Sequence, residues 1–136
     1  MLAANASLYS GVVCTLIDAR RQNVYAGAYD TTKQFENVIE DHHYSVEDFL
    51  TKLDELQTPI LFVGHDADNF WEAIVEKLGD RAIRAPYTYD LPDAAQLIYL
   101  AEKMPPLTGD AVHNFVPQYR RLAEAEANWI KDQKNK

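Results

Sequence analysis

The sequence predicts an α/β fold in which a mixed five-stranded sheet is flanked by helices. Three β-prone segments joined by short turns come first, which favours an antiparallel meander. Segments with helical spacing then alternate with two short strand-like segments, a pattern typical of strands added through helical crossovers. The length of 136 residues is that of one domain, and 47% apolar residues can supply a core.

The first three predicted strands form the meander. Residues 12–17 are an almost unbroken apolar run, which is typical of a strand buried on both faces. The polar turn 18–23 leads into a second β-prone run at 24–29, so these two strands are expected to form a hairpin. A third strand is predicted at 33–39, because the short loop 30–32 favours antiparallel pairing with the second.

Two helices with an apolar stripe are predicted after the meander. The first begins at Ser45, whose hydroxyl can cap it, and ends before Pro59. The second is about ten residues long, takes Asp66 or Asp68 as its cap, and ends at Gly79. The sequence therefore predicts two short helices that can each bury one face against the sheet.

Two short strands, 60–63 and 81–85, complete the predicted sheet. A third helix opens at residues 90–93, carries an apolar stripe, and ends before the proline pair 105–106. The segment 107–118 is expected to be an ordered loop. This order of elements predicts a ribonuclease-H-like lobe, the unit that is repeated in the actin-like ATPase architecture.

The charge of the chain argues against a free-standing nucleic-acid-binding protein. The net charge is −8 and the pI is about 4.8, whereas phosphate contacts need clustered lysine and arginine. Residues 117–136 hold five basic and three acidic residues, and the rest of the chain is strongly acidic. A short helix is predicted at 122–131. The basic tail could contact an acidic partner or bind RNA weakly, but the favoured interpretation is a solvated helix end.

The single cysteine, Cys14, lies in the first apolar strand. One cysteine cannot form an internal disulfide, so the reducing cytoplasm is the expected compartment and a small core residue the expected role. No apolar run reaches the roughly 18 residues of a membrane span, and the first residues lack the basic region of a signal peptide. We therefore expect no membrane partner.

The hairpin turn carries Asp18, Arg20 and Arg21, and it is the first candidate site because a rigid sheet can aim polar groups. One hypothesis is a metal-dependent hydrolase, in which Asp66 and Asp68 approach Asp18 from the end of the neighbouring strand. The favoured alternative is that Asp18 bonds backbone groups of the turn and pairs with one of the arginines. We predict that Asp18, Arg20 and Arg21 belong to an interaction site and not to a catalytic one.

The remaining motifs predict no catalytic, cofactor or metal residue. His42 and His43 are adjacent without further ligands at metal-binding spacing, so we expect exposed loop residues. The segment after Gly64 has one glycine and flanking acids, unlike a phosphate-binding loop. His65 and His113 are each suited to general-base work, but no serine or cysteine nucleophile motif accompanies them.

The segment 114–121 is a second candidate interaction site. It holds two aromatic residues, a proline and two arginines, and tyrosine and arginine are frequent anchors of interfaces. Tyr119 and Arg120 are the residues we expect to make such contacts. Packing of this segment on the chain's own sheet and contact with a partner are both open.

Four segments, in this order and spacing, resemble the C-terminal half of the TsaB (YeaZ) family of bacterial tRNA threonylcarbamoyladenosine biosynthesis proteins. They are LIDARRQNVYAGAY, ILFVGHDA, LPDAAQLIYLA and VPQYRRLAEAE. The hairpin pattern DAR followed by VY and A is the most specific of them, and the ending P-x-Y-R supports it. The resemblance covers residues 2–130.

The resemblance implies an actin-like ATPase fold of two ribonuclease-H-like lobes and a function without catalysis. TsaB is a paralogue of the enzyme TsaD; it binds TsaD and, with TsaE, supports transfer of the threonylcarbamoyl group to adenosine 37 of tRNA. Contact with tRNA is then indirect, and no cofactor is implied. Older glycoprotease labels correspond to the hydrolase hypothesis above, and a kinase-like phosphotransferase lobe is a third possibility.

The chain departs from the family in one respect. The Asp-Thr-Ser strand and the Gly-Ser-Phe-Thr-Gly segment of the family's N-terminal lobe have no counterpart here. We therefore expect a C-terminal fragment, with residues 1–10 as the end of the linking helix and residues 11–136 as one domain. The resemblance assigns the main TsaD-binding helices to the other lobe, and a lobe separated from its sibling is expected to self-associate through exposed apolar surface.

Overall fold

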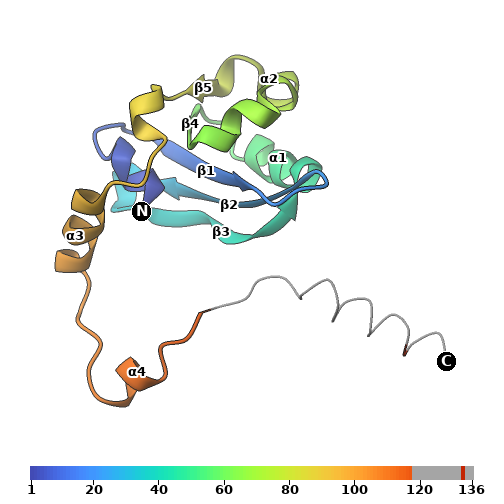
Figure 1. Cartoon of the computed structure of the whole chain (residues 1–136). Helices are drawn as coiled ribbons and strands as arrows, with labels where there is room; N and C mark the ends of the chain where they lie inside the picture. Colours follow the sequence, from blue (N-terminus) through green and yellow to red (C-terminus); the bar gives the residue numbers. More distant parts are fainter. Residues whose placement is uncertain (118–132, 134–136) are drawn as a thin grey trace. The chain divides into compact units, whose positions relative to one another are not determined.

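The computed structural model describes residues 1–117 and residue 133. Its sheet has five strands in the order β3-β2-β1-β4-β5 (Figure 1). The strands are β1 Val12–Asp18, β2 Asn23–Asp30, β3 Glu36–Ser45, β4 Ile60–Val63 and β5 Ala82–Arg84. β2 is antiparallel to β1 and β3, whereas β4 is parallel to β1 and β5. The predicted five-stranded mixed sheet is confirmed, and its arrangement is consistent with the predicted ribonuclease-H-like lobe.

The described helices occupy the stretches between and after these strands. They are α1 Val46–Glu55, α2 Trp71–Leu78, α3 Ala94–Lys103 and α4 Asp110–His113, with short 3-10 turns η1 Leu2–Ala6, η2 Thr31–Lys33, η3 His65–Phe70, η4 Gly79–Arg81 and η5 Tyr87–Tyr89. The chain divides into two compact units, residues 1–106 and 107–136. The sheet and α1 to α3 belong to the first unit.

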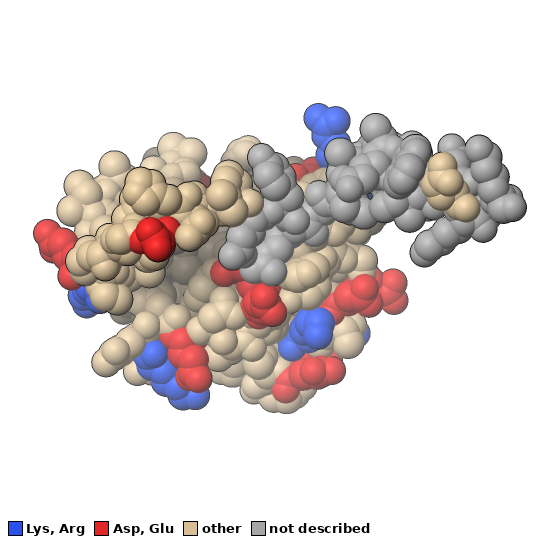
Figure 2. All heavy atoms as spheres, turned by 90° about the horizontal axis from the view of Figure 1, so that it is seen from below, with Lys and Arg blue, Asp and Glu red and all other residues tan. Residues whose placement is uncertain are grey.

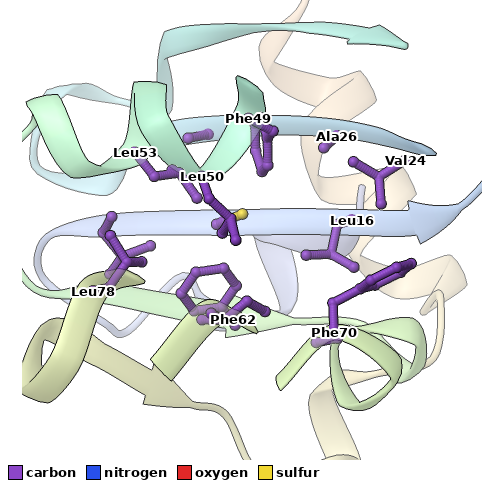
Figure 3. Close-up of a cluster of buried hydrophobic side chains, with 14 of the residues drawn as sticks. Leu16, Val24, Ala26, Phe49, Leu50, Leu53, Phe62, Phe70 and Leu78 are labelled. Carbon is purple, nitrogen blue, oxygen red and sulfur yellow. The ribbon is translucent and has the colours of Figure 1, made fainter. Parts of the chain in front are cut away.

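The main core lies between the sheet and helices α1 and α2. Phe49, Leu50 and Leu53 of α1 point toward the strands, where they meet Phe62 of β4 and Leu16 of β1 (Figure 3). Cys14 is fully buried in the same cluster, and burial raises the pKa of its thiol above the ordinary range. The predicted role of this cysteine as a small core residue is confirmed.

The other face of the sheet carries a second, smaller core. Val13, Leu61 and Val63 face the alanines of η1 there. The Asn5 side chain fixes η1 by donating to the carbonyl oxygens of Tyr89 and Leu91, at 2.8 and 2.7 Å. β1 and β4 are therefore covered on both faces, which explains their nearly continuous apolar sequences.

Helix starts were predictable where a side chain caps the backbone. The Ser45 hydroxyl accepts from the Asp48 amide at 3.1 Å, and the Asp93 carboxylate accepts from the Ala95 amide at 2.8 Å. The predicted single helix with an Asp66 or Asp68 cap was wrong. The 3-10 turn η3 precedes α2, and neither acid caps a helix, because both side chains bond other parts of the chain.

The third strand also differs from its predicted range, since β3 begins at Glu36 and continues to Ser45. The Asp30 carboxylate accepts from the Thr32 amide and holds η2 at the place where the strand was expected to start. Pairing with β2 then continues through register shifts. His42 and His43 are consequently strand residues and not loop residues.

The C-terminal part of the described chain shows two further differences. Residues 107–117 include the short helix α4, where a loop was expected. The apolar stripe of α3 is largely exposed: Leu97 is 54% and Ile98 61% exposed. The predicted helix at 122–131 lies outside the described residues. Among those that are described, no helix is long and apolar enough to cross a membrane.

Gly27 of β2 provides a test of packing on the face of the sheet that carries the second, smaller core. A Cβ at this position would lie 2.5 Å from Oδ1 of Asp41, which accepts a hydrogen bond from the Tyr29 hydroxyl. We expect Gly27→Ala to lower the free energy of unfolding by about 1 kcal/mol, since the Asp41 carboxylate must move and its hydrogen bond with Tyr29 is disturbed. Urea unfolding measures this cost in Gly27→Ala and in the double variant that also carries Asp41→Ala. Addition of Asp41→Ala should remove most of this cost, and a cost unchanged in the double variant would contradict the steric explanation.

Candidate functional site

The turn between β1 and β2 has an uncommon backbone. Arg20, Arg21 and Gln22 all have positive φ angles, of 64°, 54° and 57°. Residues other than glycine rarely adopt this left-handed conformation, and three in succession persist only where surrounding contacts enforce it. The predicted interaction residues Arg20 and Arg21 therefore stand on a conformation that is costly to form.

Side-chain bonds to the backbone hold this turn. The Asp18 carboxylate accepts from the Arg20 amide at 2.7 Å. The Asn23 amide group donates to the carbonyl oxygens of Arg20 and Arg21, at 3.2 and 2.8 Å. Asp18 thus bonds the backbone of the turn, which is the first part of the favoured interpretation of the sequence. Its pairing with one of the arginines stays a prediction.

The turn is also tied to two neighbouring elements. The Asp18 amide donates to Oδ2 of Asp66 at 2.8 Å, so the ends of β1 and β4 are joined. The Val46 amide donates to the Gln22 carbonyl oxygen at 3.0 Å, which fixes the start of α1 against the turn. The structure therefore brings Asp66 to Asp18 as predicted, but through a backbone amide.

Asp68 is engaged elsewhere, in a charged cluster around Arg84. Nε of Arg84 lies 2.8 Å from Oδ1 of Asp68, and Nη2 lies 2.6 Å from Oδ2 of Asp90. Asp90 also accepts from the Gly64 amide at 2.9 Å and is only 7% exposed. The Arg84 hydrogen bonds lower the pKa of both carboxyl groups below the ordinary range.

Sequence reasoning missed this cluster. Asp90 was interpreted as part of a helix start, and Arg84 as part of a short strand. The cluster closes the carboxyl ends of β4 and β5 and links them to the segment before α3. Its only sequence signal was an arginine within a short strand, where burial of an unpaired charge is energetically costly and a partner is therefore expected.

The three acids of the hydrolase hypothesis do not gather into one site. Asp18 and Asp66 bond backbone amides, and Asp68 pairs with Arg84. Within residues 1–117 and at 133, no group of three histidine, cysteine or acidic side chains is placed to hold a metal ion. A two-metal hydrolytic site needs several carboxylates that converge, so this geometry does not support the hypothesis.

The predicted interaction residues are only partly described. Arg20 and Arg21 are exposed, and no ion pair is found for the Arg20 guanidinium in the described part of the chain. Tyr119 and Arg120 lie outside the described residues. On the face shown in Figure 2, the blue basic side chains are few and interspersed with red acidic ones, so they form no continuous basic patch there.

A groove lies between α1 and α2, beside the hairpin turn. Its volume is about 610 Å³, which is within the usual range of binding pockets. It is lined by Gln22, Ser45, Val46, Glu47, Leu50, Ala73, Glu76 and Lys77. Gln22 is the residue of the strained turn that lines the groove, whereas Arg20 and Arg21 do not line it. Sequence reasoning had not anticipated the groove.

Comparison with known proteins identifies a relative of this chain. No family model matches the chain. The tRNA threonylcarbamoyladenosine biosynthesis protein TsaB of Bacillus subtilis (strain 168) is 36% identical to it over 134 residues. The chain is a relative of TsaB. The match includes 98% of the chain, so it takes in the hairpin turn, the charged cluster and the groove.

The resemblance to TsaB predicted from the sequence is therefore confirmed, and the sheet order agrees with the fold that it implied. The chain spans 57% of the length of the Bacillus TsaB. The identity thus relates this chain to somewhat more than half of TsaB, and the activity and partners of the whole relative are taken up as proposals below.

The Asp90–Arg84 pair predicts a pH-dependent stability. Because the folded-state pKa of Asp90 is below its unfolded value of about 3.9, the pair stabilises the protein above that pH, and this contribution is lost as the pH falls through the folded-state pKa. Asp90→Asn should cost about 3 kcal/mol at pH 7. Urea unfolding at pH 7 and at about pH 3 should show the difference from wild type narrowing in acid. An equal difference at both pH values would contradict the ion-pair explanation.

Proposed function

We propose that the chain acts in the threonylcarbamoylation of adenosine 37 of tRNA, as a non-catalytic partner of TsaD that works together with TsaE. The observation that carries the proposal is the 36% identity to TsaB across 98% of the chain. Transfer chemistry then belongs to TsaD, contact with tRNA is indirect, and the protein acts in the cytoplasm without a cofactor of its own.

The site geometry supports a positioning role. The acids Asp18, Asp66 and Asp68 are used to fix backbone and arginine groups, so they are not arranged for proton transfer or metal binding. Arg20 and Arg21 are held on a rigid turn, which is how an interaction surface is presented with little loss of entropy on binding. We propose that these residues, with Tyr119 and Arg120, contact a protein partner.

Reconstitution tests the proposed function. A mixture of TsaD, TsaE, tRNA and a threonylcarbamoyl donor is prepared without TsaB, and formation of modified adenosine is measured by mass spectrometry of digested tRNA. We expect the protein encoded by the whole reading frame that contains this chain to restore modification. The Bacillus TsaB, in a mixture of its own partners, is the positive control.

Failure of the chain's own protein to restore modification, while TsaD and TsaE are active in the control mixture, would defeat the proposed function. Activity in a mixture that lacks TsaD would defeat the non-catalytic assignment. The two results can be distinguished, because activity without TsaD would leave the proposed role in tRNA modification in place and reject only the non-catalytic role.

The exposed stripe of α3 supports an additional proposal about assembly. Leu97 and Ile98 of α3 are 54% and 61% exposed, and Leu91, which precedes the helix, is 72% exposed. Large exposed apolar patches usually mark surface that another chain or domain covers. We propose that the family's other lobe covers it in a longer protein, and that the isolated chain self-associates through it.

Self-association is measured by size-exclusion chromatography with light scattering. The 136-residue chain should form a dimer or larger assembly at high concentration, and Leu97→Lys with Ile98→Lys should shift it toward the monomer, since two charges cannot be buried in an apolar interface. A wild-type chain that is monomeric at all concentrations would contradict the proposal. Val75→Lys, which alters an exposed apolar residue of α2, is the matched control.

A further inference from the structure

The floor of the groove between α1 and α2 is apolar and open. Val46 and Leu50 of α1 are 8% and 5% exposed, yet both line the groove together with Ala73 of α2. Alanine ends at Cβ, so α2 leaves space above these two side chains where a larger residue would have filled it. The groove is thus a place where a side chain from outside can reach the edge of the main core.

The rim of the groove is charged. Glu47 and Glu76 stand on it together with Lys77, and no ion pair is found for any of the three within the described residues. Asp54, by contrast, pairs with Arg81 beside the same helices. An apolar floor bordered by charges that have no ion-pair partner among residues 1–117 is the usual anatomy of a protein interface.

The walls of the groove are fixed before anything binds. The Ser45 hydroxyl caps α1, and the Val46 amide is bonded to the Gln22 carbonyl oxygen of the strained turn. The residues that begin α1 therefore cannot shift without breaking the turn. A preformed groove loses little conformational entropy on binding, which favours docking of a partner's structured segment.

We propose that this groove docks an amphipathic helix of a partner protein, with apolar residues over Val46 and Leu50 and basic residues beside Glu47 and Glu76. Two helices with an open furrow between them accept a third helix, whose apolar face repeats every three to four residues. Acids outnumber the single lysine on the rim, and the chain has a net charge of −8, so a basic helix is the complementary partner. The inference rests on the proposed function for the choice of TsaD and TsaE as the proteins tested.

The test measures binding of the chain to TsaD and to TsaE from its own organism by biolayer interferometry. Ala73→Arg fills the groove and should weaken binding to one of them about tenfold or more. Val75→Arg is the matched control, because Val75 is an exposed apolar residue of the same helix that does not line the groove. It should leave the affinity within about twofold of wild type.

Charge reversal gives a second comparison that does not disturb the core. Glu47→Lys with Glu76→Lys should weaken binding about tenfold and reduce its salt dependence, whereas Glu72→Lys, on α2 but outside the groove, should have little effect. Thermal melts establish that each variant is folded. If Ala73→Arg does not fold, the charge pair decides the question.

Three results would overturn the docking proposal. They are equal weakening by the groove variants and their controls, no binding of the wild-type chain to either protein, and disruption of self-association by Ala73→Arg in place of partner binding. The reconstitution described above is scored separately, so restored tRNA modification with no groove effect would reject this surface and keep the proposed function.

Discussion

Burial of β1 on both of its faces is the constraint on which the rest of the structure depends. Cys14 and Leu16 face the helices α1 and α2, while Val13 faces η1. A strand that is apolar on both faces must lie at the centre of a sheet with cover on both sides. A central strand has backbone hydrogen-bonding groups on two edges. In β1 these are paired with β2, which is antiparallel, and with β4, which is parallel.

The end of this central strand is consequently the place where polar groups meet. β1 leaves the core at Asp18, whose amide and carboxylate bond Asp66 and the amide of Arg20. These bonds compensate for a turn in which three residues adopt a left-handed conformation. The same turn borders the α1–α2 groove through Gln22, so the stability of the central strand and the shape of the outer surface are coupled.

The amino-acid sequence was sufficient to predict the antiparallel meander, the two later strands and the Ser45 cap, since these depend on local patterns. The apolar run of β1 and the Ser45 cap needed no knowledge of distant residues. β3 was misplaced because η2 and the irregular pairing with β2 are set by contacts across the sheet. The Arg84–Asp90 cluster was missed for the same reason, since its charges meet only after β4 and β5 are side by side.

The way in which charged groups are used explains why the sequence allowed a metal site as an alternative to the favoured structural role of the acids. An acidic residue that follows a strand can bind a metal ion or accept a hydrogen bond from the backbone. Only the groups that face its carboxylate in the folded protein distinguish the two roles. Asp66 faces an amide and Asp68 faces a guanidinium. Each contact lowers the energy of one folded arrangement and leaves that carboxylate less free to bind a cation. The same bonds from carboxylates to backbone amides and to Arg84 hold the hairpin turn and keep the acids from converging on one point. Both features suit a protein whose role is to offer a fixed surface to a partner.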